Sequence, residues 1–387
     1  MLYLGTNTAP VFCYAEEINT DSSQTGEEIN AGETINDILD ALDLSEYDEF
    51  IKSLELLNEN YTVRELIDGI LNNESTLDFN DLTEYIFSLF LGNVKNLIVQ
   101  AIVIIIITVV MSIMQNATSA FSKDSVKKIV FIACYGTIIT IVGFIIGESI
   151  ELTITTLSRI TKFSNTVFPI LLTIITAMGA TATASIYKPL ILIFGGVLIK
   201  AINAIIMPLF YVCIVFNIIG NISDDIKLEK LSNLSKSVGD WIIGILFGVF
   251  ITYTTAKGIT GASIDNIATR GGKYAVGNYV PIIGNYLKEG FDIISSSFLL
   301  VKNTFGFVSV IILIFICISP LIKIGTTILV LRLTAAITEP FADKKITNML
   351  CGISKSLNML VVINVAVSFS MLIIITLIIA TCNIGVV

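Results

Sequence analysis

The stretch IVIIIITVV, Ile102 to Val110, contains a single hydroxyl group and no charge. It forms the centre of a longer apolar run from Val94 to Met114. About 20 apolar residues are enough to cross the hydrocarbon core of a bilayer as an α-helix. A helix also satisfies its own backbone hydrogen bonds, which lipid cannot do. We therefore predict a membrane-spanning helix here, and we ask how many similar segments the chain contains.

The composition of the whole chain agrees with several such segments. The 387 residues are 54% hydrophobic and only 14% charged, and the mean hydropathy is +0.84. Soluble domains carry about 25% charged residues, so this chain has too few charges to cover a surface that faces water. A membrane β-barrel would show short alternating segments instead. The expected fold is therefore an all-α, polytopic membrane protein.

Further apolar stretches bring the predicted number of spans to about seven. Lysines 123, 127 and 128 follow the first span and mark a cytoplasmic loop by the positive-inside preference. We expect residues 148–163 to lie outside the membrane, residues 223–240 to lie on its surface, and the fourth span to kink near Pro208. The remaining predicted spans are Ile129 to Ile150, Thr166 to Ala184, Pro189 to Ile219, Trp241 to Thr255, Phe305 to Leu333 and Leu357 to Thr381.

The N-terminal part of the chain has a different character. Residues 1–15 resemble the end of a signal peptide, although they carry no basic segment, and a disordered N-terminus is the alternative. Residues 16–88 form an acidic region, with twenty acidic and two basic residues up to Tyr85. Helical spacing of its apolar residues predicts a small amphipathic domain that docks a partner or lies over the membrane domain, residues 89–387. Its charge favours the extracytoplasmic side.

The passage from Gly261 to Gly290 interrupts the apolar pattern with six glycines and five charged residues. Gly271 and Gly272 are expected to break a helix, and Pro281 removes a backbone donor. The motif GNY occurs at Gly277 and again at Gly284. We predict a re-entrant or interfacial hairpin, with an ordinary cytoplasmic loop as the alternative.

Two lysines lie inside apolar runs, where a charge costs about 3 kcal/mol on insertion scales. Lys200 lies near the middle of the fourth predicted span, and Lys323 lies within the sixth. Each could face a polar cavity or a partner helix, or its long side chain could reach the membrane interface. Neither lysine alone defines a transporter.

Signatures of enzymes are weak in this chain. Histidine is absent, which excludes catalytic arrangements and metal sites that need an imidazole. The glycine spacing of a phosphate-binding loop is missing, and the six cysteines form no CxxC pair. We expect no enzymatic activity, no cofactor, no metal and no nucleic-acid partner.

Residues 257–306 carry a family resemblance. Lys257, Asp265, Arg270 and Lys273 precede GNYVPIIG, residues 277–284, and LVKNTFG, residues 300–306. Together with KFSNTVFPILLTIITAMG, residues 162–179, these motifs resemble the stage III sporulation protein AE family. The resemblance runs from about residue 90 to the C-terminus, whereas the N-terminal region is similar only in character.

The resemblance implies a role in endospore formation. Members of the family are integral proteins of the mother-cell membrane around the forespore. They belong to a channel, or feeding-tube, complex with the other stage III A-operon proteins and stage II sporulation protein Q. A homo-oligomer of this chain is a further expected form of association. A secondary transporter of a small solute, with Lys200 and the passage from Gly261 to Gly290 at its site, is the alternative function. The candidate pore or assembly residues are Lys200, Lys257, Asp265, Arg270, Lys273, Gly277, Pro281, Gly284, Lys302 and Asn303.

Overall fold

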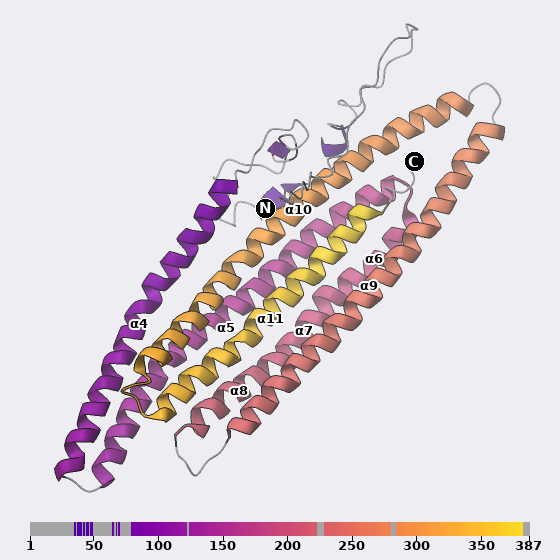
Figure 1. Cartoon of the computed structure of the whole chain (residues 1–387). Coiled ribbons are helices and arrows are strands. Elements are labelled where there is room, and N and C mark those ends of the chain that lie inside the picture. Colours follow the sequence, from indigo (N-terminus) through magenta and orange to yellow (C-terminus); the bar gives the residue numbers. More distant parts are fainter. Residues whose placement is uncertain are drawn as a thin grey trace, which may run out of the picture.

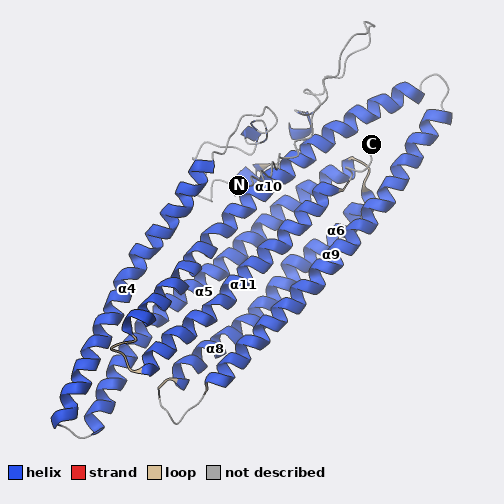
Figure 2. Cartoon of the chain, in the orientation of Figure 1, coloured by secondary structure: helices blue, strands red, loops and turns tan. Residues whose placement is uncertain are grey.

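The structure, a computed structural model, describes residues 79–121, 124–222, 228–279 and 284–381, together with scattered residues between 35 and 69. The regular elements of the four long ranges are all helical (Figures 1 and 2). The predicted signal peptide, residues 1–15, lies outside the described residues. The expected all-α fold is confirmed.

Long helices form an elongated bundle, and six in the described ranges are long and apolar enough to cross a membrane. The chain runs to and fro along the bundle, so that each of the six long helical stretches is antiparallel to the next (Figure 1). The elements are α4 (Phe79–Phe121), α5 (Asp124–Ala177), α6 (Thr181–Leu192), η1 (Ile193–Leu198), α7 (Ile199–Ala201), η2 (Ile202–Ile206), α8 (Met207–Gly220), α9 (Glu229–Tyr279), α10 (Gly284–Thr338) and α11 (Lys344–Ala380).

The count of six rather than seven has a local cause in α5. The second and third predicted spans belong to this one helix of 54 residues, which is about 80 Å long at 1.5 Å per residue. Residues 148–163 interrupt the apolar pattern but not the helix, because Glu, Arg and Lys are good helix formers. The expected interruption between two spans at 148–163 was therefore wrong. Residues 229–240 of the predicted surface segment form the beginning of α9.

The fourth predicted span is one apolar rod of irregular helix, residues 181–220. Two π-helical segments, η1 and η2, interrupt it, and α7 lies between them. Pro208 stands in the first turn of α8, directly after η2, where its missing N–H is best tolerated. A π-helical segment, which is a local irregularity of the helix, therefore ends directly before the residues where we expected a kink.

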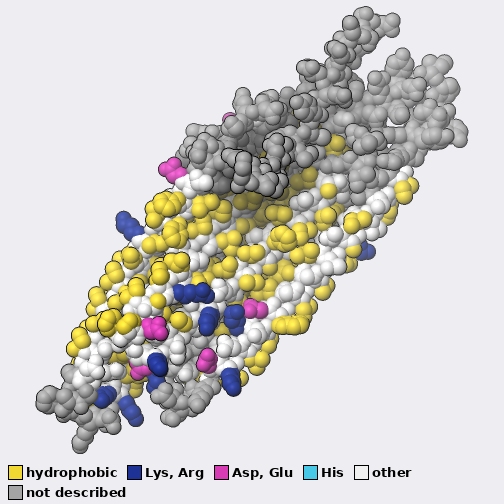
Figure 3. Space-filling view, in the orientation of Figure 1, with side chains coloured by type: hydrophobic (Ala, Val, Ile, Leu, Met, Phe, Trp, Pro, Cys, Tyr) yellow, Lys and Arg dark blue, Asp and Glu magenta, His cyan; other side chains and the backbone are white. Residues whose placement is uncertain are grey.

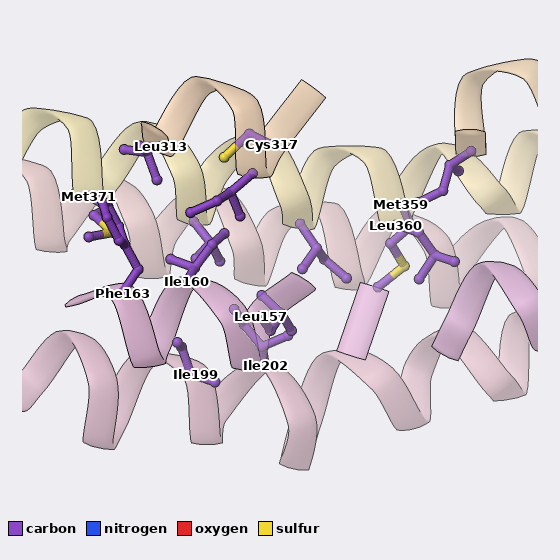
Figure 4. Close-up of a cluster of buried hydrophobic side chains, with 14 of the residues drawn as sticks. Leu157, Ile160, Phe163, Ile199, Ile202, Leu313, Cys317, Met359, Leu360 and Met371 are labelled. Atoms are coloured by element: carbon purple, nitrogen blue, oxygen red, sulfur yellow. The ribbon is translucent and has the colours of Figure 1, made fainter. Parts of the chain in front are cut away.

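The core surrounds α11, which contacts α10, α9, α5 and α8. Figure 4 shows buried side chains from α5, α7, η2, α10 and α11 meeting in one cluster, among them Leu157, Ile202 and Leu360. Apolar side chains also cover much of the outer surface in Figure 3, and Leu192 and Trp241 are more than 70% exposed. Such an apolar exterior belongs in contact with lipid rather than water.

Part of the acidic N-terminal region packs on this bundle. The Tyr47 ring is fully buried, with its centroid 5.1 Å from that of Phe305 and 5.9 Å from that of Phe163. Its hydroxyl shares a hydrogen bond of 3.0 Å with Ser309 Oγ. Leu39 of the same region joins the buried core of the bundle. The described residues of this region therefore lie against their own membrane domain.

Tyr47→Ala should release this contact, because it removes a buried aromatic side chain that contributes about 3 kcal/mol or more. We expect faster cleavage by trypsin at the exposed Arg64 in detergent-solubilised protein. Tyr47→Phe loses only the hydrogen bond, about 1 kcal/mol, and should have a small effect. Replacement of the exposed Asp37 by alanine is the control, and equal cleavage rates in all variants would contradict the docking.

The same contact has a predictable dependence on pH. Burial raises the pKa of the Tyr47 phenol above its usual value of 10.0, and the hydrogen bond to Ser309 lowers it by a smaller amount. A raised pKa means that the neutral phenol is favoured in the folded state. The contribution of Tyr47 is therefore complete below about pH 10 and is lost as the pH rises further. Protease resistance measured on both sides of this pH can test the loss.

Candidate functional site: a clamp on the α9–α10 hairpin

The glycine-rich passage forms the far ends of two long helices. Helix α9 continues through Gly271 and Gly272 to Tyr279, and α10 begins at Gly284. The expected helix break at the glycine pair was wrong, since each helical glycine costs only about 1 kcal/mol. No short re-entrant segment separates α9 from α10 in the described residues. Positions 280–283, which include Pro281, lie outside them.

Asp265 on α9 caps the N-terminus of α6. Its Oδ1 accepts a hydrogen bond of 3.0 Å from the backbone N–H of Ala182, and its Oδ2 accepts one of 2.7 Å from that of Thr183. The N-cap residue of α6, Ala180, offers no side-chain acceptor of its own. A helix N-terminus carries free N–H groups and partial positive charge. The buried carboxylate of Asp265, on a neighbouring helix, accepts two of these N–H groups and places a negative charge beside the positive helix end.

Lys302 on α10 caps the C-terminus of α11. The side chain is fully buried. Its ammonium donates a hydrogen bond of 2.8 Å to the carbonyl oxygen of Ile379 and another to that of Thr381. These carbonyls belong to the end of α11, where four acceptors lack partners within the helix. A cation there also interacts favourably with the helix dipole.

Glycines bring the helices close enough for these contacts. A Cβ atom at Gly261 would lie 3.2 Å from Thr183 Cα, and one at Gly258 would lie 2.5 Å from Tyr187 Oη. On the other helix, a Cβ atom at Gly306 would overlap Ile379 Cγ1. We use the name clamp for Asp265, Lys302, Gly258, Gly261 and Gly306.

Beyond the clamp, both helices continue away from the bundle. Residues 266–279 of α9 follow Asp265, and residues 284–301 of α10 precede Lys302. At 1.5 Å per residue these segments are about 21 and 27 Å long. Figure 1 shows the ends of α9 and α10 extending past the neighbouring helices. The clamp therefore holds the base of a projecting helical hairpin.

The structure brings some of the predicted site residues together and separates others. Asp265 and Lys302 belong to the clamp. Beside Lys302, the buried Oδ1 atom of Asn303 has no hydrogen-bond partner in the described part of the chain. Lys257 is exposed on α9, with its ammonium 5.8 Å from the centroid of the Tyr253 ring.

The other members of the predicted set lie farther along the hairpin. Arg270, Lys273 and Gly277 belong to the projecting part of α9, and Gly284 is the first residue of α10. The predicted positions in the glycine-rich passage therefore follow one another from the clamp to the tip of the hairpin.

Lys200 lies apart from this group. It belongs to α7, between the two π-helical segments, and its side chain is exposed on the outside of the helix. Three of the cavities in the described part of the chain are lined by other residues. Lys200 lines none of these three cavities.

A second polar cluster was missed by sequence reasoning. Asn217 Nδ2 on α8 donates to Ser232 Oγ on α9 at 2.7 Å and to Ser356 Oγ on α11 at 3.1 Å. Cys213, one turn away on α8, lies 3.2 Å from the same Ser356 oxygen. Gly352 allows the approach, because a Cβ atom there would overlap Asn217 Oδ1. Small and polar residues at four-residue spacing were the available signal.

Gly306→Ala should destabilise the protein, because the new methyl group would overlap Ile379 beside a carbonyl that Lys302 binds. Overpacking of this kind costs about 1–3 kcal/mol, and we expect a lower melting temperature. Gly248→Ala is the matched control, since a Cβ atom at Gly248 would meet nothing within 4 Å. Equal melting temperatures for the two variants would contradict the close approach.

The chain is similar to known proteins over most of its length. Residues 61–382 match the family described as stage III sporulation protein AE. The stage III sporulation protein AE of Bacillus subtilis (strain 168) is 28% identical over 275 residues, which are 71% of this chain and 68% of that protein. No solved structure matches the chain. The matched region includes all six long helices and both charged residues of the clamp, and the chain therefore belongs to the stage III sporulation protein AE family.

Proposed function

We propose that this protein is a non-enzymatic membrane component of the channel complex that joins the mother cell to the forespore during endospore formation. It acts there as a membrane platform or a permease-like pore. Family membership supports the role in sporulation. The clamp is the observation that carries the platform role, because Asp265 and Lys302 are occupied in holding helix ends rather than facing a substrate.

The orientation that we propose follows from the turns of the bundle. The last residues of α4, α8 and α10 and the first residues of α5, α9 and α11 lie at the same end of the bundle (Figure 1). Basic residues gather in or beside these turns in the sequence, which favours the cytoplasm for that end. They are Lys123, Lys127, Lys128, Lys227, Lys230, Lys344 and Lys345. The tip of the hairpin, the C-terminus and the acidic N-terminal region then lie on the extracytoplasmic side of the mother-cell membrane.

The proposed partners are other stage III A-operon proteins and the stage II sporulation protein Q complex. On the proposed orientation, the projecting hairpin enters the space between the two membranes, where such partners would meet it. Its length of about 20 Å or more beyond the clamp makes it the part best placed for assembly. Members of the complex could also include a second copy of this chain.

Crosslinking in sporulating cells tests this proposal. A photo-crosslinking amino acid is placed at Asn278 or Asn285, at the tip of the hairpin, and at the exposed Phe144 on α5 as the control. We expect the tip positions to capture stage III A-operon proteins and Phe144 to capture little besides lipid. Recovery of this protein without any such partner, from both tip positions and in a direct pull-down, would contradict the proposal.

The alternative function, a secondary transporter of a small solute, loses its original support at Lys200 because that side chain faces outward. A different observation favours it, namely a polar cleft between α4, α5 and α10. If purified protein in liposomes takes up no small solute, this alternative is wrong, whereas the platform role is unaffected.

A further inference from the structure

A polar cleft of about 420 Å³ lies between α4, α5 and α10, away from the clamp. It is within the range of roughly 300–1,000 Å³ that is typical of ligand sites, at the small end. Its lining combines opposite charges, amides and hydroxyls with a few apolar side chains. The lining residues are Ser88, Leu89, Gly92, Asn93, Asn96, Leu97, Glu148, Ser149, Leu152, Lys323, Ile324 and Thr327.

The two charges of the cleft do not neutralise each other directly. Glu148 comes from α5 and Lys323 from α10. The ion pairs in the described part of the chain are Arg64–Asp40 and Lys236–Asp240, so Glu148 and Lys323 face one cleft without forming a bridge. Ionisable side chains on membrane-spanning helices are costly and usually serve a function. Because they form no bridge with each other, both charges are available to a ligand in the cleft.

Other polar groups of the cleft are either fixed or available. Asn93 Nδ2 donates to the backbone oxygen of Lys323 at 2.9 Å, which fastens α4 to α10 at the cleft. Thr327 donates to the same oxygen at 2.9 Å. The amide of Asn96 has no hydrogen-bond partner in the described part of the chain and lines the cleft. It can therefore offer a ligand both a donor and an acceptor.

We propose that this cleft binds a small zwitterion of the amino-acid class. Lys323 takes the carboxylate, Glu148 takes the ammonium group, and Asn96 adds a hydrogen bond. A simple anion would meet repulsion from Glu148, and a simple cation would meet repulsion from Lys323. Only a ligand with both charges satisfies both residues. The apolar side chains of Leu97, Leu152 and Ile324 leave space for a small apolar substituent.

Gly92 provides a sharp way to close the cleft. A Cβ atom there would meet nothing within 4 Å, and Gly92 lines the cleft, so we expect a leucine at this position to be tolerated by the fold and to fill part of the cleft. Gly136 on α5 is the matched control, because it is equally open and lines none of the three cavities in the described residues. For the charges, Glu151 on α5 and Arg332 on α10 are exposed controls outside the cleft.

The experiment measures melting temperatures of the full chain in nanodiscs with each of the twenty free L-amino acids, followed by calorimetric Kd values for those that stabilise it. We expect at least one amino acid to bind, and acetate and methylammonium to give no shift. Glu148→Gln and Lys323→Gln should each weaken binding by about tenfold or more, the usual size of a lost charge-assisted contact. Gly92→Leu should abolish it.

Gly136→Leu, Glu151→Gln and Arg332→Gln should bind as the wild type does. The proposal is overturned if no amino acid stabilises the protein, or if stabilisation persists in Gly92→Leu and in both charge variants. Crosslinking at the hairpin tip does not depend on the cleft, so failure here is distinguishable from failure of the platform role.

Discussion

Lys302→Ala should lower the stability of the protein more than any other single change in the clamp. It removes a fully buried ammonium and leaves the carbonyls of Ile379 and Thr381 without this donor. Hydrogen bonds to charged groups contribute about 1.5–3 kcal/mol each, and the variant also creates a cavity. We expect a loss of about 3 kcal/mol or more, seen as a melting temperature lower by several degrees in detergent.

Two further variants separate charge from volume at this position. Lys302→Met keeps most of the buried volume and removes only the donor, so it should recover part of the loss. Lys257→Ala, on the neighbouring α9, removes an exposed lysine and should leave the melting temperature unchanged. If Lys302→Ala melts at the temperature of the wild type, the cap on α11 contributes nothing to stability.

Asp265→Ala should free the first turn of α6. The carboxylate receives two backbone N–H groups, from Ala182 and Thr183, and no side chain of the N-cap residue replaces it. Loss of an N-cap costs about 1–2 kcal/mol. Because this cap makes two charge-assisted hydrogen bonds, we expect its loss to cost about 2 kcal/mol or more. We expect faster hydrogen exchange at both amides together with a lower melting temperature.

Asp265→Asn and Ser263→Ala complete the comparison. The asparagine keeps one oxygen acceptor and should give an intermediate rate of exchange. Ser263 is exposed on α9 and bonds only to Ile259 of its own helix among the described contacts, so its replacement should change nothing at α6. Unchanged exchange at Ala182 and Thr183 in Asp265→Ala would show that the carboxylate does not cap α6.

The fold class was predictable because apolar runs are a local signal. The first span was placed correctly within α4, whose apolar centre has no interruption. Helix α5 was divided wrongly, because Glu148, Arg159 and Lys162 lower the hydropathy without affecting helix propensity. The glycine pair at 271–272 caused the opposite error, because it predicted a break where α9 is continuous. Hydropathy reports where a segment can lie, whereas a break in the helix depends on packing and turn chemistry.

The site was predictable only as a set of candidate positions. The family motifs drew attention to Asp265 and Lys302, but their roles depend on helix ends more than 75 residues away in the chain. Glu148 was overlooked because it stands at the end of a predicted span, where a charge is ordinary. Glu148 and Lys323 come to line one cleft only when α4, α5 and α10 pack together.

Labelling of single cysteines tests the central claim, that the glycine-rich passage is a hairpin of two spanning helices with its tip opposite the lysine-rich turns. In a background without the six native cysteines, Asn278→Cys, Asn285→Cys and Glu339→Cys are exposed in cells to a reagent that does not cross membranes. We predict labelling at positions 278 and 285 from outside the cytoplasm, and at 339 only after the membrane is permeabilised. Labelling of 278 and 285 from opposite sides, or of both only after permeabilisation, would contradict the account.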